Sequence, residues 1–279
     1  MPLVSTGELV SAAAAGGQGV AAFNVITLEH AEAIAAGAER AGRPAILQIS
    51  ENAVKFHGGR LTAIAAATAA VARASHAPLS LHLDHVESPG LLRAADGEGF
   101  SSVMFDASKL SYEANIAATA EAVAWGHARG IWIEAELGKD GEPPLGAHAP
   151  GVRTDPAEAV AYVRDTGVDA LAVAVGSSHA MTDRTAALDH GLIGALRRAV
   201  PVPLVLHGSS GVPDAEIRQA VAAGMVKINV GTALNTAFTG AARAFLAADT
   251  KAVDPRKYLV PAREAMTGTV AAFLKVISG

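Results

Sequence analysis

The sequence predicts an α/β fold in which eight parallel strands, with helices between them, close into a single (β/α)8 barrel. Short apolar runs alternate with longer, helically periodic segments along all 279 residues. Apolar residues make up 51% of the chain but aromatic residues only 4%, which suits buried parallel strands covered by alanine-rich helices. No linker interrupts the series, so we expect residues 1–279 to form one TIM-barrel domain.

The expected strands are short runs of Val, Leu, Ile and Ala, at residues 20–25, 45–49, 79–83, 102–105, 131–135, 170–175, 204–206 and 226–230. Helices are expected between them, at residues 28–41, 61–74, 112–129, 156–166, 188–199 and 214–223. An open doubly wound sheet would carry a glycine-rich loop after its first strand, and residues 23–26 do not form one. A closed barrel is therefore the better interpretation.

Composition and charge exclude several kinds of partner. The formal charge is −5, from 22 basic and 27 acidic residues without a Lys/Arg block, so no nucleic-acid partner is expected. Because cysteine is absent, a transition metal would have to use His and carboxylate ligands. The N-terminus lacks a signal-peptide pattern, and the apolar segment 63–72 is too short to cross a bilayer. We expect a cytoplasmic protein with no membrane partner.

Polar residues follow the expected strands, where barrels of this kind carry their chemistry. His85, His179 and His207 occupy equivalent positions after three different strands, so closure of the barrel would bring them together. Three imidazoles with an open fourth position are typical of a catalytic zinc ion. Taken singly, each histidine is equally well explained as a strand cap or a packed core residue. His82 has the wrong parity in its strand, and we expect it to point away from its neighbours.

Further features of these strand ends also suggest chemistry. Asp84 precedes His85, which places a carboxylate beside the metal as a general acid or base, or as a group that orients a histidine ring. Residues 206–211 and 227–232 supply glycines and hydroxyls whose backbone N–H groups can cradle a phosphate. The long stretch 138–154, with three prolines, is expected to be a mobile active-site loop.

Five motifs together resemble those of the class II fructose- and tagatose-bisphosphate aldolases. They are LHLDH at 81–85, EAELG at 134–138, AVAVGSSH at 172–179, LVLHGSSG at 204–211 and KINVGT at 227–232. They follow the family's order and cover nearly the whole chain. The resemblance implies reversible, zinc-dependent cleavage of fructose 1,6-bisphosphate or tagatose 1,6-bisphosphate to dihydroxyacetone phosphate and glyceraldehyde 3-phosphate. The zinc would polarise the carbonyl of dihydroxyacetone phosphate and stabilise its enediolate.

The same resemblance implies roles for individual residues. His85, His179 and His207 would bind zinc, Asp84 would move the proton of the C4 hydroxyl, and Asp106 and Glu136 match residues that can hold a second divalent or a monovalent cation. The sugar phosphate would be held by Asn24, Ser50, Gly208, Ser209, Ser210, Asn229, Val230, Gly231 and Thr232. Arg256 matches an arginine that reaches the distal phosphate of a neighbouring subunit, which implies a homodimer or homotetramer.

The sequence departs from the family's pattern at three places. Ala180 replaces the usual glycine beside the zinc histidine, where the backbone meets phosphate or a monovalent cation. Gly231 stands where fructose-type members tend to have Asp or Asn and tagatose-type members often have Ala, which leaves the sugar preference open. The loop at 138–144 lacks the usual Gly-Gly followed by paired acids. Glu142 is the best remaining candidate for the base that takes the proton from dihydroxyacetone phosphate, with Asp140 second.

Other functions stay open at this point. A Schiff-base aldolase needs a buried lysine, and Lys227 is the only candidate near the strand ends, but it would leave the histidines unexplained. A barrel hydrolase would tend to have a His-x-His pair on its first strand, where Asn24 stands. The altered loop also allows a non-catalytic member of the family that binds a sugar phosphate or stabilises a partner.

Overall fold

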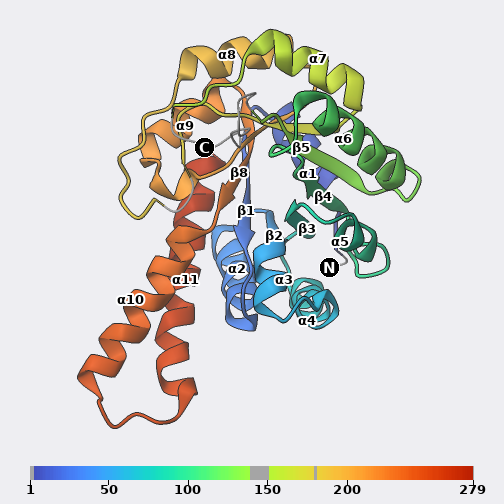
Figure 1. The fold of residues 1–279 in the computed structure, drawn as a ribbon. Coiled ribbons are helices and arrows are strands. Elements are labelled where there is room, and N and C mark those ends of the chain that lie inside the picture. The colour runs from blue at the N-terminus through green and yellow to red at the C-terminus, as the bar shows by residue number, and fades with distance from the viewer. Residues whose placement is uncertain (1–2, 139–150, 179–180, 279) are drawn as a thin grey trace.

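The fold is a closed parallel barrel, seen in a computed structural model that describes residues 3–138, 151–178 and 181–278. Each strand pairs with the next along the chain, and β1 pairs with β8 to close the ring (Figure 1). The strands are β1 (Val20–Asn24), β2 (Ala45–Ser50), β3 (Leu79–Val86), β4 (Ser102–Phe105), β5 (Trp132–Glu136), β6 (Ala170–Ala172), β7 (Leu204–Leu206) and β8 (Met225–Val230). The predicted (β/α)8 TIM barrel is confirmed.

Helices surround the barrel. Those that connect successive strands are α2 (Leu28–Ala41), α3 (Glu51–Phe56), α4 (Leu61–Ala74), α5 (Pro89–Ala94), α6 (Tyr112–His127), α7 (Pro156–Thr166), α8 (His190–Ala199) and α9 (Asp214–Ala223), with a 3-10 turn η1 (Ser209–Gly211) after β7. Before β1 comes α1 (Thr6–Ala15), and after β8 come α10 (Thr232–Ala248) and α11 (Pro255–Ile277). None of the helices in the described part of the chain combines the length and apolar character needed to span a membrane.

Local sequence signals set the helix ends. The side chain of Asp155 accepts hydrogen bonds from the N–H groups of Ala157 and Glu158 at the start of α7, and Pro156 occupies the first turn, where its missing N–H costs nothing. Gly167 ends the same helix in the left-handed conformation, which glycine adopts without strain. These caps fix where α7 begins and ends.

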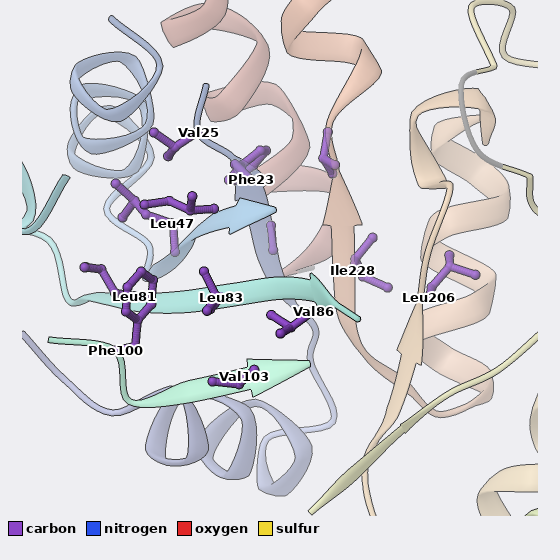
Figure 2. Close-up of a cluster of buried hydrophobic side chains, with 14 of the residues drawn as sticks. Phe23, Val25, Leu47, Leu81, Leu83, Val86, Phe100, Val103, Leu206 and Ile228 are labelled. Atoms are coloured by element: carbon purple, nitrogen blue, oxygen red, sulfur yellow. The ribbon is translucent and has the colours of Figure 1, made fainter. Parts of the chain in front are cut away.

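The main apolar core lies between the strands and the helices. Alternate strand residues such as Phe23, Leu47, Leu83 and Val103 are buried there (Figure 2). At one end of the barrel, Val10 of α1 packs with a small interior cluster made by Val20, Ala22, Ile46 and Val226. The apolar layers therefore cover the outside of the strands and seal one end of the barrel.

Many of the inward-facing side chains nearer the carboxyl ends of the strands are polar. They are Gln48, His82, Asp84, Glu134, Glu136, Lys227 and Asn229, all of them buried. Since side chains of a strand alternate between its two faces, the apolar residues between them face the helices. The barrel interior therefore carries charge.

The last two helices form an antiparallel hairpin that extends beyond the barrel (Figure 1). α11 is anchored by Met266 and Val270, which are fully buried. All residues of α10 are described, and Leu234 is the only buried one among them, although the helix is rich in Ala, Leu and Phe. Some of its apolar side chains, such as Phe238, pack partly against the core, whereas Leu246 is exposed. The sequence analysis did not predict this hairpin.

Several predicted boundaries are wrong. β3 continues to Val86, beyond the expected end at residue 83, through an irregular register between Leu83 and Val86. β6 ends at Ala172, before the expected residue 175, because its neighbour β7 ends at Leu206 and the chain then turns at Gly208. The helices α1, α3 and α5 were also missed, and the last two are only six residues long each.

Candidate active site

A cavity of about 470 Å³ opens at the carboxyl ends of the strands. Most of the residues expected from the sequence line it. They are Asn24, Ser50, Asp84, His85, Asp106, Glu136, Gly208, Ser210, Asn229, Gly231 and Thr232. The barrel thus brings together residues that are more than 200 positions apart in the chain. His179, Ala180, Asp140 and Glu142 lie outside the described residues.

An irregular backbone at the end of β3 brings two consecutive side chains into this cavity. In a regular strand, Asp84 and His85 would face opposite sides. His85 instead has φ of 49°, a left-handed conformation that is uncommon outside glycine, and the register of β3 against β4 shifts at the same place. Both side chains consequently line the cavity. Strain of this kind is characteristic of functional sites.

Two overlapping groups of side chains at the mouth could hold a cation. Ligand atoms of Asp84, His85 and His207 lie within 4.8 Å of one another, and so do those of His85, Asp106 and Glu136. The rings of His85 and His207 meet edge to face, with centroids 4.7 Å apart. Two imidazoles among carboxylates, without any thiolate, are a donor set that fits zinc. The described residues therefore fit the metal that the sequence predicted.

The electrostatics of the site also favour a cation. Burial alone would lower the pKa of His85, but the carboxylates of Asp84, Asp106 and Glu136 outweigh it and raise this pKa to about 10. Burial opposes ionisation of Asp106 as well, yet hydrogen bonds from His85 and Ser108 hold its pKa well below the usual range. The carboxylates around His85 therefore favour a positive charge at this position.

The structure corrects the prediction for His82. This side chain does not point away from its neighbours but lies fully buried inside the barrel, with Nε2 3.8 Å from Asp84 Oδ1. Its Nδ1 lies 2.7 Å from the hydroxyl of Ser102. The reason is the parity of β3, because His82 and Asp84 are two residues apart and share the inner face, whereas His85 reaches that side only through its unusual backbone.

Sequence reasoning missed several polar groups that hold the site residues. Gln48 Nε2 lies 2.5 Å from Asn24 Oδ1 and 3.3 Å from Asp84 Oδ2. The hydroxyl of Ser108 lies 2.7 Å from Asp106 Oδ1. The sequence does contain a sign of the role of Gln48. It is a polar residue within a mostly apolar strand, and it lies two residues before Ser50, so both side chains point to the same face.

Glu134 and Lys227 form a buried ion pair that sequence reasoning did not predict. Glu134 Oε1 lies 3.0 Å from His207 Nε2, and Lys227 Nζ lies 2.8 Å from Glu134 Oε2. Both side chains are fully buried and neither lines the cavity. A lysine held in such an ion pair is poorly placed to attack a carbonyl, so the geometry argues against the Schiff-base alternative.

The glycine-rich segments meet at one side of the cavity. Gly208 has φ of 67°, and a Cβ there would lie 2.5 Å from the carbonyl oxygen of Ser178, so only glycine fits. The hydroxyl of Ser210 accepts hydrogen bonds from the N–H groups of Gly231 and Ala233, at 3.3 and 3.1 Å. The first turn of α10 is thereby fixed at the edge of the cavity.

Three of the expected substrate-binding side chains do not reach the cavity. Ser209 is fully buried and donates its hydroxyl proton to the carbonyl oxygen of Asn229, and Val230 is fully buried in the core. Arg256 lies at the start of α11, where its side chain is 87% exposed and paired with Asp254. It is thus outside the cavity of its own chain.

Comparisons with known proteins agree over almost the full length. A family model described as "Fructose-bisphosphate aldolase class-II" matches residues 4–279. The fructose-bisphosphate aldolase of Geobacillus stearothermophilus is 39% identical over 272 residues, which cover 97% of this chain and 95% of that protein. The fructose-bisphosphate aldolase of Thermus caldophilus is 38% identical over 294 residues, which cover 96% of this chain and 95% of that protein. The crystal structure of the YdjI aldolase from Escherichia coli K12 superposes with a TM-score of 0.85 at 30% identity, covering 99% of this chain and 97% of that one.

Proposed function

The chain belongs to the class II fructose-bisphosphate aldolase family, and we propose that the cavity at its barrel mouth cleaves a ketose 1,6-bisphosphate with a bound zinc ion. The protein is thus an aldolase, a lyase that breaks a carbon–carbon bond. The observation that carries the proposal is the cluster formed by ligand atoms of Asp84, His85 and His207, all within 4.8 Å of one another. Asp84 and His85 line the cavity, and His207 is buried behind them. The proposed substrate is fructose 1,6-bisphosphate or its C4 epimer, tagatose 1,6-bisphosphate. The products are dihydroxyacetone phosphate and glyceraldehyde 3-phosphate.

His85 and His207 would hold the zinc ion, and we include His179 from its motif. A zinc ion bound there would act as a Lewis acid on the ketose carbonyl and so favour negative charge on the neighbouring carbon. Two features of the chain support this assignment. The ring of His207 is held through Nε2 by Glu134, and His85 Nδ1 lies 3.2 Å from Asp106 Oδ2. Carboxylates bonded to ring nitrogens in this way are typical of histidines that bind metals.

Asp84 is proposed to take the proton of the C4 hydroxyl. As that O–H bond breaks, C4 becomes the carbonyl carbon of glyceraldehyde 3-phosphate, and the electron pair of the C3–C4 bond stays on the triose carbon. Burial raises the pKa of Asp84, although His85 and Lys227 oppose the shift, so the carboxylate is a better base than an exposed aspartate. Gln48 donates to its Oδ2 at 3.3 Å and orients the group. Glu142 would then return a proton to the triose carbon.

The phosphate of the triose half is proposed to bind beside α10. Gly208, Ser210, Gly231 and Thr232 line this side of the cavity, and the N-terminus of α10 presents backbone N–H groups and the positive end of a helix dipole. Asp106 and Glu136 would hold the second, weaker cation, because their carboxylates cluster with His85. Asn24 and Ser50, which line the other side of the cavity, would bind the sugar hydroxyls.

We also propose that the protein is a homodimer or homotetramer in which Arg256 serves the active site of a neighbouring subunit. Arg256 is exposed and away from its own cavity. The hairpin of α10 and α11 that carries it extends beyond the barrel and exposes Leu246, Val253 and Val260. Apolar side chains on a projecting hairpin are suited to burial against another copy.

Parallel assays of fructose and tagatose 1,6-bisphosphate cleavage, before and after chelation, test the function. We expect cleavage of at least one of the two sugars, loss of that activity in excess chelator and recovery when zinc is added. Full activity after chelation and dialysis would overturn the metal-dependent mechanism. Failure to cleave either sugar with zinc present would favour a non-catalytic member of the family.

A further inference from the structure

A continuous series of buried polar contacts joins the proposed metal ligand His207 to the cavity residue Asn229. His207, Glu134 and Lys227 are fully buried, and Asn229 is 7% exposed. Glu134 Oε1 lies 3.0 Å from His207 Nε2, Lys227 Nζ lies 2.8 Å from Glu134 Oε2, and Lys227 Nζ donates to Asn229 Oδ1 at 2.9 Å. The four residues come from β5, the end of β7, and β8, so their contacts tie three strands together at the base of the site.

At one end of this series of contacts, Glu134 fixes the orientation of the His207 ring. A carboxylate only accepts hydrogen bonds when ionised, so Glu134 keeps the Nε2 proton of His207 on its own side. Nδ1 is then the ring nitrogen that faces the metal site. Such a contact is known to set both the orientation and the basicity of a histidine that binds a metal.

At the other end of the series, Lys227 fixes the orientation of the Asn229 amide. An ammonium group can only donate hydrogen bonds, so the atom of Asn229 that faces Lys227 has to be Oδ1. The amide Nδ2 must then face the other way, and it has no hydrogen-bond partner among the described residues. Asn229 lines the cavity, which makes this N–H group a donor for substrate.

We propose that Lys227 is a positioning residue that couples the metal site to the substrate-binding amide, acting through Glu134 on His207 and directly on Asn229. The inference rests on the proposed function. Geometry supports a role beyond packing, because one ammonium group contacts both the carboxylate that holds the metal ligand and the amide that faces the substrate. A lysine with only a structural role would need neither connection.

Replacing Lys227 with Met keeps the length of the side chain and removes its charge. We expect zinc affinity, measured by competition with a chromophoric chelator in the absence of substrate, to fall about 10- to 100-fold. In zinc-saturated enzyme, we expect KM for the bisphosphate to rise more than kcat falls, because Asn229 loses its fixed orientation. Lys275→Met, at an exposed position of α11, is the matched control and should alter neither quantity.

A second variant separates positioning from stability, since removing one member of a buried ion pair can unfold a protein. Lys227→Met combined with Glu134→Gln removes both charges and should recover the melting temperature of the zinc-free protein. We expect its zinc affinity to stay low and its KM to stay high. Wild-type zinc affinity and KM in either variant would overturn the proposal, as would failure of both to fold, since the pair would then serve the core alone. A wild-type protein that bound no zinc would overturn the proposed function and this coupling together.

Discussion

Asp84 and His85 are adjacent in the chain, and both line the same cavity because His85 has φ of 49°. The proposed proton-transfer group and a proposed metal ligand are thereby held side by side on one strand. Their carboxylate and imidazole belong to the same group of ligand atoms within 4.8 Å. The two residues nevertheless have separable roles, which substitutions can distinguish.

Asp84→Asn keeps the shape of the side chain and removes its basicity. We expect turnover to fall about 10²- to 10⁴-fold while the zinc content stays nearly unchanged, because proton transfer is lost and the histidines remain. Steady-state kinetics and metal analysis of the same preparation check this. Asp165→Asn, at an exposed ion pair on α7, is the control. Loss of zinc along with activity would make Asp84 a ligand instead.

Gly231→Ala tests the contact between Gly231, which follows β8, and Asn24 at the end of β1. A Cβ at residue 231 would lie 3.0 Å from Asn24 Nδ2, so the Asn24 side chain, which contacts Gln48, has to shift by a few tenths of an ångström. We expect kcat/KM to fall about tenfold, equivalent to about 1.4 kcal/mol, and the ratio of fructose to tagatose cleavage to change. Gly240→Ala, where an added Cβ meets nothing within 4 Å, should leave both unchanged. Equal kinetics for the two variants would contradict a role of this contact.

Glu142→Ala addresses the residue proposed to exchange the proton of the triose carbon. We expect exchange of the dihydroxyacetone phosphate proton with solvent to slow by about 10²-fold, with zinc binding intact. Proton NMR in heavy water follows the exchange, and Glu158→Ala, on the surface of α7, serves as the control. Unchanged exchange would transfer the role to Asp140, which the same assay can test.

Arg256→Ala tests whether neighbouring subunits share a site. The variant should have a raised KM for the bisphosphate, because the distal phosphate loses a cationic partner. Arg164→Ala, at another exposed Arg–Asp pair, should not. Co-expression of Arg256→Ala with the inactive His207→Ala should restore part of the activity, since a mixed dimer then contains one complete site. No gain on co-expression would place Arg256 outside the partner's site.

The fold was largely predictable because hydrophobic periodicity reports burial directly. β7 is a continuous apolar run and β2 is largely apolar, and the positions of both strands were predicted to within one residue. The short helices α3 and α5 and the hairpin of α10 and α11 were not predicted. A helix of six residues is too short for its hydrophobic periodicity to be detected. The apolar residues of α10 do not show from the sequence alone what they pack against.

The site was only partly predictable, because parity arguments assume regular strands. Asp106 and Glu136 were expected near the site from the family resemblance, and they line the cavity because they lie at strand ends, which barrel closure brings together. His82 was misjudged because the irregularity at His85 reverses the expected parity beyond that point. The pairing of Glu134 with Lys227 was not predicted, because both residues lie within strands and their contact depends on distances across the barrel that no local sequence pattern records.

The division between an apolar outer layer and a charged interior has an evolutionary consequence. Residues such as Leu47 and Val103 maintain the fold from outside the strands, whereas Gln48, Glu134 and Lys227 face inward and contact the proposed site residues. Selection can therefore act differently on the two sets, since an inward substitution that keeps the Glu134–Lys227 ion pair leaves the packing of the shell in place. A barrel built in this way can drift from one sugar phosphate to another without first losing its architecture.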